Sequence, residues 1–447
     1  MPSPLQCPDA EAISASLGVL ASARMPAIQH FTLDNGLSVY LCENHSAPLV
    51  AVQIWYHIGA SHEPPGRSNL SHLLEHLIFR GSSKLPAGLY SRLIARLGGV
   101  ANATTHSDST VFEITLPAAR LPVALELMAD AMNTANFDRT VFELEVRAVE
   151  SERRLKVGGS SLQRAYEQHQ KLAYGDTPYA EPSFGHAIDL ADMDLATVHT
   201  WYRTWYHPNN ASLVVVGAAN LQQLRQQVET YFAALPPAPL RDKPSLRHSG
   251  ELKERDQQLV EPTLPNALFM SFNVPSHATA PSVETMPALR LLAAILGDGF
   301  SALLYSHLVR DRLLLRGVSV NYDHQLQGDS LFTLMAFMAP NSAITPQQAA
   351  IEIWQLIDGL RSTPLPEHVL QGQKLRLLAR ELHEGSKLEE KATRIGRAAA
   401  AGLDPTALAE LPSFLQNLSS TTLQQVATDY LSRERLTTTY LLQGAPA

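Results

Sequence analysis

The chain has 447 residues, of which 45% are hydrophobic, and its formal net charge is −8 at pH 7. This length predicts two or more domains with sizeable cores, and the mild charge argues against nucleic acid as a partner. No run of about 18 apolar residues occurs, so we expect no membrane span. The N-terminus lacks a signal-peptide pattern, which leaves open a soluble cytoplasmic protein and a periplasmic one whose leader was removed. Two cysteines, Cys7 and Cys42, are too few for a disulfide framework or for zinc ligation.

The first predicted elements are strands. Phe31–Tyr40 indicates a hairpin around Asn35-Gly36, the strongest short turn signal in this region. Apolar runs with strand composition follow along the chain, separated by long amphipathic helices. These predicted strands are Val52–Tyr56, Leu213–Val216, Ala267–Val274 and Leu331–Phe337. Similar patterns on both sides of the chain's middle predict two α+β halves.

The next predicted element is a helix between Ser68 and Gly81, and it contains His72-Leu-Leu-Glu-His76. Histidines four residues apart lie one turn apart on a helix, close enough to hold one metal ion. Glu75 lies on the same side and can point at a water near that metal. The opposite face is apolar, which suits packing on a core. It consists of Leu70, Leu73, Leu74, Leu77 and Ile78.

The ends of this helix also carry signals. Gly66 and Ser68 suit its start, and Gly81 suits a left-handed stop. The order H-x-x-E-H is typical of inverzincin metallopeptidases. The alternative interpretation is a surface helix with two solvated histidines. A catalytic zinc normally takes three protein ligands, so the motif needs an acidic residue from another element.

A helix that begins at Asp138 and ends at residues 158–159 supplies such a residue. Glu145 and Glu152 are seven residues apart on it, almost two turns, and therefore share a face. The alternative is that both glutamates are solvated, as helical glutamates usually are. Apolar residues on the same helix are expected to seat it against the core: Val141, Val149 and Leu155.

With these residues in view, the sequence resembles the pitrilysin/insulinase family of zinc metallopeptidases, in its short, mitochondrial-processing-peptidase-like branch. That family carries H-x-x-E-H, then a glutamate ligand about 75 residues later, with a second glutamate seven residues before it; here 75 residues separate His76 from Glu152. The resemblance implies that one Zn²⁺ per chain is bound by His72, His76 and Glu152. It also implies that Glu75 is the general base and that Glu145 is an assisting carboxylate.

Further stretches resemble recurrent motifs of the same family, and the resemblance is clear over about residues 27–340. They are Gly59–Glu63, Leu97–Thr105, Tyr174–Tyr179, Trp205–Ala211 and Leu213–Gly217. The resemblance implies an α+β fold of two homologous α/β-roll halves, each a mixed antiparallel sheet flanked by helices, arranged as a clam shell.

The chain is expected to divide near its middle. Residues 234–258 are rich in proline and charge, with little periodicity, as is typical of a linker. We therefore expect an N-terminal zinc-binding catalytic half at 1–233 and a homologous C-terminal half without a metal site at 259–447.

Substrate contacts follow only from the resemblance. In the family, the strand that corresponds to Asn102 and Ala103 is a sheet edge that pairs with the substrate backbone, as in strand addition. The alternative is that Asn102 shapes a turn. Phe79, close behind His76, is a candidate for the floor of the site, and a plain core aromatic is the alternative.

The second half departs from the family pattern at one position. Active single-chain and homodimeric members carry a substrate-binding arginine followed seven residues later by a tyrosine. Arg310 matches the arginine, but the tyrosine position is Gly317, and Tyr322 reaches that place only with a local shift. This gap predicts a heterodimer in which a homologous partner subunit supplies the arginine–tyrosine pair.

The predicted function is therefore that of a zinc metalloendopeptidase. It would hydrolyse peptides or unfolded segments with a water that Glu75 activates at the zinc. Two alternatives remain open: a self-sufficient homodimeric peptidase in which Tyr322 replaces the tyrosine or the pair is dispensable, and a non-catalytic core subunit of a larger complex.

Overall fold

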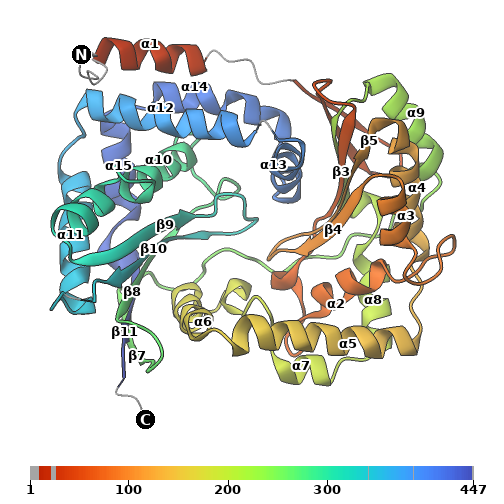
Figure 1. The fold of residues 1–447 in the computed structure, drawn as a ribbon, viewed down its shortest axis with the longest axis horizontal. Coiled ribbons are helices and arrows are strands. Elements are labelled where there is room, and N and C mark those ends of the chain that lie inside the picture. Colours follow the sequence, from red (N-terminus) through yellow and green to blue (C-terminus); the bar gives the residue numbers. More distant parts are fainter. Residues whose placement is uncertain (1–9, 22–26, 341, 386, 445–447) are drawn as a thin grey trace, which may run out of the picture.

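The computed structural model describes residues 10–21, 27–340, 342–385 and 387–444. Figure 1 shows two parts side by side, each built on one sheet with helices against it. We call them the first half, around a six-stranded sheet, and the second half, around a five-stranded sheet. The protein is an α+β clam shell, which confirms the expected fold class. Within the described residues, no helix is long and apolar enough to cross a membrane.

The first sheet has the strand order β1-β2-β6-β3-β5-β4. Its strands are β1 (Ile28–Thr32), β2 (Ser38–Glu43), β3 (Leu49–Tyr56), β4 (Val100–Thr105), β5 (Thr110–Pro117) and β6 (Ala211–Gly217). β2 and β6 run parallel, and every other neighbouring pair is antiparallel. β4 therefore forms one edge of the sheet, as expected for the strand that carries Asn102.

The second sheet has the order β7-β11-β8-β10-β9. Its strands are β7 (Arg255–Val260), β8 (Ala267–Val274), β9 (Leu315–Tyr322), β10 (Ser330–Met338) and β11 (Leu436–Leu442). β7 and β11 are parallel and the remaining pairs antiparallel. This is the arrangement of β2-β6-β3-β5-β4, so the two halves share one topology and β9 is the counterpart of the edge strand β4.

Helices cover both sheets. Those of the first half are α2 (Leu70–Ile78), α3 (Tyr90–Arg96), α4 (Leu121–Thr134), α5 (Arg139–Arg153), α6 (Ser161–Tyr174), α7 (Ala187–Ala191), α8 (Leu195–Trp205) and α9 (Leu221–Phe232). Those of the second half are α10 (Thr285–Gly297), α11 (Pro346–Ser362), α12 (Glu367–Glu384), α13 (Leu388–Ala400), α14 (Leu411–Asn417) and α15 (Ser420–Tyr430). α1 (Ala10–Ala21) begins the described chain but packs on α12 and α14, with Leu17 buried in the second half's core.

Each half packs one helix against the sheet of the other half. α13 of the second half covers one face of the first sheet, and Gly396 lies so close to Trp55 that a Cβ would be 2.0 Å from the indole nitrogen. α6 of the first half covers a face of the second sheet in return. There the buried His169 bonds to Thr439 at 2.8 Å and to Ser271 at 2.7 Å. These interlocked helices fix the relative position of the two halves.

The strand predictions are confirmed. Gly36, with φ of 88°, turns the predicted hairpin between β1 and β2, and β3, β6, β8 and β10 contain the other predicted strands. In the predicted linker 234–258, the first regular element is β7, which begins at Arg255. The division of the chain at this stretch stays a prediction. Cys42 is buried in β2, and Cys7 lies outside the described residues.

Candidate active site

The helix α2 has the buried face that the sequence predicts. The five apolar residues of that face are each at most 4% exposed. Its left-handed residue is at the start, where Asn69 caps the helix with φ of 71°. The expected left-handed stop at Gly81 is wrong, because the glycines with positive φ do not include it. Instead, Arg80 N bonds to Leu77 O at 2.9 Å and closes the helix in a tighter turn.

A buried carboxylate anchors the start of α2. Glu63 Oε1 accepts a hydrogen bond from Ser71 N at 2.6 Å, which satisfies one of the amides that a helix start leaves without an internal partner. Ser68 is occupied elsewhere, since its hydroxyl donates to Asp189 Oδ2 at 2.6 Å. Burial raises the pKa of the Glu63 carboxyl to about 8, although the hydrogen bonds that it accepts from Ser71 and Asn69 oppose the shift. The helix that carries the histidines is thus oriented by a side chain that favours the neutral form.

Stability should therefore fall with rising pH through Glu63. Its pKa is about 8 in the folded chain against an ordinary 4.5, so the folded state binds the proton more tightly between these values. By linkage, this contribution is complete below pH 4.5 and is lost as pH rises to about 8. Glu63→Gln should remove it, so the stability of the wild type relative to the variant should decrease from pH 5 to pH 8. Urea unfolding midpoints across this range measure the difference, with exposed Glu143→Gln as control; parallel curves for wild type and Glu63→Gln would contradict the prediction.

The helix α5 lies against α2 and brings its glutamates to the histidines. Asp138 caps it as predicted, accepting from Val141 N at 2.9 Å. A π-helical turn, η3 (Arg154–Gly158), continues the helix to the predicted end. Leu155 was expected to seat the helix, but it is 78% exposed, so that prediction is wrong. Leu155 lies within the π turn, where the angular spacing of side chains differs from that of the α-helix.

His72, His76 and Glu152 come together as a group of three possible metal ligands. Oε2 of Glu152 is 3.6 Å from Nε2 of His72 and 3.6 Å from Nε2 of His76. All three ligand atoms lie within 4.8 Å of one another. Zinc bonds of 2.0–2.2 Å in a tetrahedron place two donor atoms about 3.4 Å apart. The donor types therefore fit zinc, and each histidine nitrogen lies close to this distance from Glu152 Oε2.

The two imidazoles differ in electrostatics. Burial, reinforced by His76, lowers the pKa of His72 to about 4, so its ring is neutral at pH 7 and keeps a lone pair for a metal. Burial also acts to lower the pKa of His76, but the hydrogen bond to Glu145 and the nearby carboxylates raise it overall. His76 Nδ1 and Glu145 Oε2 are 3.1 Å apart. This contact fixes the ring and leaves Nε2 for the metal.

Glu75 lies on the face of α2 that carries the histidines, and a strand residue holds its carboxylate. Thr105, the last residue of β4, donates its hydroxyl to Glu75 Oε2 at 2.5 Å. Burial raises the pKa of the Glu75 carboxyl, and the hydrogen bond from Thr105 opposes this. The candidate base is thus tied directly to the edge strand beside the site.

The other candidates for substrate contacts lie near this strand. Asn102 is on β4 and donates to Glu113 Oε1 at 3.2 Å, while Ala103 packs partly on the first core. The Phe79 ring packs between Tyr90 and Phe112, with centroid distances of 4.7 and 5.2 Å. Asn102 and Ala103 lie on the edge strand whose Thr105 bonds to Glu75, and Phe79 lies among core aromatics.

Arg310 lies in the second half, on the π-helical segment η6 (Tyr305–Asp311). Its guanidinium is exposed and pairs with the neighbouring Asp311, with Nε 2.7 Å from Oδ1. Among the contacts of the described residues, none joins Arg310 to the three metal donors. Within a single chain, the structure does not bring this candidate to the site.

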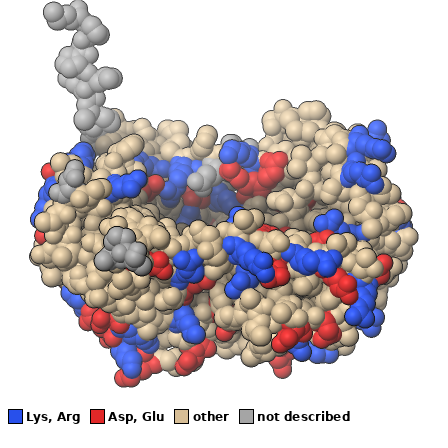
Figure 2. Space-filling model, turned by 60° about the horizontal axis from the view of Figure 1, so that its bottom comes forward, with Lys and Arg blue, Asp and Glu red and all other residues tan. Residues whose placement is uncertain are grey.

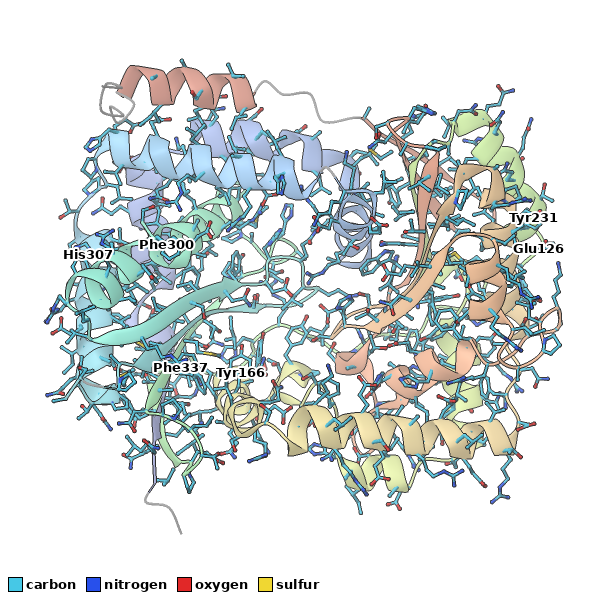
Figure 3. The ribbon with its side chains drawn as sticks, in the orientation of Figure 1. Glu126, Tyr166, Tyr231, Phe300, His307 and Phe337 are labelled. Carbon is cyan, nitrogen blue, oxygen red and sulfur yellow. The ribbon has the colours of Figure 1, made fainter. Side chains whose placement is uncertain are left out.

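Gly317, at the position of the family's tyrosine, has free space around its α-carbon. Gly317 on β9 lies opposite Phe337 on β10, whose ring packs against the apolar cluster beneath α6, near Tyr166 (Figure 3). A Cβ added at Gly317 would meet nothing within 4 Å. Tyr322 does not fill this place, because its ring is buried in the core on the other face and its hydroxyl donates to Pro275 O at 2.6 Å.

Three residues near the donors were missed by reasoning from sequence. Arg80 pairs with Glu145, Thr105 holds Glu75, and the Phe184 ring stands edge-on to His72 with centroids 6.3 Å apart. The position of Arg80, four residues after His76, continues the histidine face and was a usable signal. Thr105 and Phe184 come from other elements, and only the folded chain brings them here.

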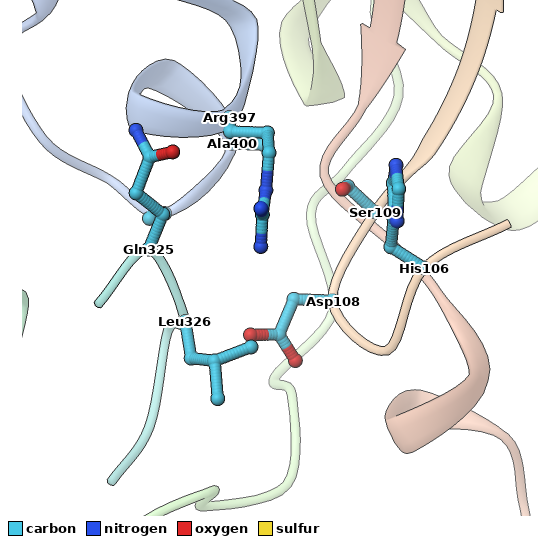
Figure 4. A pocket seen from close by; sticks show the side chains of 8 residues that line it. His106, Asp108, Ser109, Gln325, Leu326, Arg397 and Ala400 are labelled. Atoms are coloured by element: carbon cyan, nitrogen blue, oxygen red, sulfur yellow. The ribbon is translucent and has the colours of Figure 1, made fainter. Parts of the chain in front are cut away.

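The loop after β4 joins the site to the second half. Asp108 in this loop accepts hydrogen bonds from Tyr179 OH and from Gln327 N, both at 2.7 Å. Figure 4 shows the small pocket at this junction, where Arg397 of α13 lies across from His106 and Asp108. The edge strand that carries Thr105 is therefore anchored by both halves.

Known proteins similar to this chain include proteases. A family model described as Insulinase (Peptidase family M16) matches residues 38–181, and one described as Peptidase M16 inactive domain matches residues 192–377. The chain is 28% identical over 433 residues to the zinc protease PqqE of Helicobacter pylori, covering 94% of each chain. It is 23% identical over 275 residues to a probable mitochondrial-processing peptidase subunit beta of Arabidopsis thaliana, covering 61% of this chain and 51% of that protein.

A solved structure has the same fold over its whole length. The crystal structure of a protease from Helicobacter pylori superposes with a TM-score of 0.85 at 26% identity, covering 93% of this chain and 99% of that one. The two family models together account for most of this chain, one on each side of residues 182–191. The chain belongs to the insulinase family, peptidase family M16.

Proposed function

We propose that this chain is the zinc-bearing subunit of a metalloendopeptidase. One observation carries the proposal: His72 and His76 of α2 and Glu152 of α5 bring three donor atoms within 4.8 Å of one another, and Glu75 lies on the same face of α2 as the two histidines. A solvated pair of histidines would not require Glu152 from another helix at 3.6 Å from both rings. His72, His76 and Glu152 would hold the metal.

Other residues of the chain would handle the proton and orient the ligands. When bound, zinc supplies a Lewis acid that polarises a carbonyl oxygen and lowers the pKa of water. Glu75 Oε2 is held by Thr105, so Oε1 is the oxygen proposed to take the proton of the attacking water and return it to the leaving amine. Its burial raises its pKa and so strengthens it as a base. Glu145 acts through His76, whose orientation it maintains.

The proposed substrates are peptides or unfolded segments. The outer edge of β4 has no neighbouring strand among the described residues, so an extended backbone can add to it beside Asn102 and Ala103. Figure 2 shows a hollow between the two halves, with Lys and Arg side chains inside it. An extended chain can reach the edge strand in such a hollow more readily than a folded protein can.

We further propose that a homologous subunit completes the active site. Gly317 stands at the tyrosine position, Tyr322 is committed to the second core, and Arg310 pairs with Asp311 away from the donors. The similar protein from Arabidopsis thaliana is named as a subunit, which supports the idea of a shared site. A homodimer and a non-catalytic core subunit are the competing possibilities.

The direct test is hydrolysis of a mixed peptide library by the purified, zinc-loaded chain alone, with Glu75→Gln as control. Bound zinc without cleavage is the expected result, and adding the homologous partner should then produce Glu75-dependent cleavage. Glu75-dependent cleavage by the chain alone would refute the need for a partner. A chain that binds no zinc would overturn the peptidase proposal.

Restoring the tyrosine should give the chain activity of its own. Position 317 has open space and a backbone outside the positive-φ region, so Gly317→Tyr can be accommodated on the α6 face of β9. A hydrogen-bond donor to a developing oxyanion is worth about 10²–10³ in rate, so we expect at least about tenfold more Glu75-dependent cleavage by the isolated variant. Gly317→Phe, which adds the ring without the hydroxyl, is the matched control. Equal rates for both variants, or no gain in either, would contradict the prediction.

A further inference from the structure

The three possible metal ligands belong to a longer row of acidic and basic side chains between α2 and α5. His72, His76 and Arg80 follow one another at intervals of four residues, so they share a face of α2 and of the turn that extends it. Glu152 and Glu145 stand opposite them on α5. Along the interface, basic and acidic side chains alternate: His72, Glu152, His76, Glu145 and Arg80.

Arg80 is the last residue of this row, and it pairs with Glu145, the carboxylate that contacts His76. Its Nε is 2.7 Å from Glu145 Oε1, while Glu145 Oε2 is 3.1 Å from His76 Nδ1. Each oxygen of one carboxylate is thus bound by a different partner. The side chain of Glu145 is only 6% exposed, whereas that of Arg80 is 46% exposed. A buried carboxylate is costly unless a cation and hydrogen bonds compensate it, and Arg80 provides that cation from the solvent side.

We propose that Arg80 is a positioning residue for metal binding. It holds Glu145 in one rotamer, Glu145 holds the Nδ1 side of the His76 ring, and Nε2 is thereby directed toward His72 and Glu152. Arg80 does not touch the donor atoms, so its effect passes through Glu145. The inference rests on the proposed zinc site and extends it by one residue that no ligand motif includes.

The test is zinc affinity of the full-length chain, measured by competition with a chromophoric chelator. Loss of a residue that contacts a ligand directly typically costs 10–100-fold in metal affinity, so Arg80→Leu, one contact further out, should cost about 3–10-fold. Arg80→Lys should recover most of this loss because its ammonium can still pair with Glu145. Arg139→Leu, which removes an exposed arginine paired with Glu143 on α5, should leave the affinity unchanged.

A double-mutant cycle separates positioning from general stabilisation. In a Glu145→Gln background, Arg80→Leu should have little further effect, because the carboxylate through which it acts is gone. The visible spectrum of the Co²⁺-loaded chain should change in Arg80→Leu and return toward wild type in Arg80→Lys. Melting of the metal-free chain confirms that each variant folds, and Arg80→Gln replaces Arg80→Leu if the latter does not.

The outcomes separate this inference from the proposed function. If wild-type chain binds no zinc, the proposed function fails. If wild type binds zinc and Arg80→Leu binds it equally well, only the role of Arg80 is refuted. Additive losses in the cycle, or an Arg80→Lys variant as weak as Arg80→Leu, would also overturn the inference.

Discussion

Glu75→Gln is expected to abolish peptide hydrolysis while zinc stays bound. Glutamine has the shape of glutamate but cannot accept a proton, and its carbonyl can keep the hydrogen bond from Thr105. A positioned general base contributes about 10²–10⁴ to the rate, so the turnover number should fall by about a thousandfold or more. The measurement is the initial rate in the active assembly, together with the zinc content of the same sample.

A matched control for Glu75→Gln is a glutamate far from the histidines. Glu126→Gln changes an exposed carboxylate that pairs with Lys84 on another part of the first half, and it should leave the rate unchanged. Retention of full activity by Glu75→Gln would show that another group activates the water. Loss of zinc from the variant would place Glu75 among the groups that hold the metal, which the donor geometry does not require.

The part of the site that was predictable from sequence is the part with local geometry. The four-residue spacing of His72 and His76 sets their relation on any helix, and the seven-residue spacing does the same for Glu145 and Glu152. The packing of α2 against α5 is tertiary structure, and the periodicity of either helix does not predict it. Only the family resemblance connected Glu152 to the histidines before the structure did so.

The alternation of side chains along a strand also bears on whether Tyr322 can take the place of the family's tyrosine at position 317. Gly317 and Tyr322 lie five residues apart on β9, an odd number, so their side chains must point to opposite faces. The structure agrees, since Tyr322 is buried in the second core while position 317 lies opposite Phe337 on the α6 face. In this strand, therefore, the Tyr322 ring does not occupy the place beside Gly317.

Other features depended on contacts between distant segments. The packing of α6 on the second sheet and of α13 on the first depends on where the two sheets lie in the folded chain. The hydrogen bond from Thr105 to Glu75 joins a strand to a helix 30 residues apart. The π turn after α5 has no simple sequence signal, and Leu155 within it lies on the surface. These are side-chain and phase effects that pattern analysis does not resolve.

Glu152→Ala is expected to remove zinc binding with little change in the fold. Oε2 of Glu152 is the donor atom that lies 3.6 Å from both histidine nitrogens, so without it only two protein ligands remain. Loss of an outer partner costs roughly 10–100-fold in metal affinity, so loss of a ligand should cost more than about a hundredfold. The Glu152 side chain is 36% exposed, so its removal leaves little buried surface unsatisfied. Chelator competition gives the affinity without any need for activity.

Thermal melting with and without zinc provides an independent reading of the same change. A metal that binds only the folded chain raises its melting temperature in proportion to the logarithm of its concentration over Kd, so the wild type should gain stability and Glu152→Ala should not. Glu150→Ala, two residues earlier on α5, removes a carboxylate that pairs with Arg154 and should behave as wild type. If both variants lost zinc equally, general charge rather than ligation would explain the binding. If Glu152→Ala kept its zinc, the metal would have to be held by a different set of donors, and the alignment of α5 with α2 would lose its proposed role.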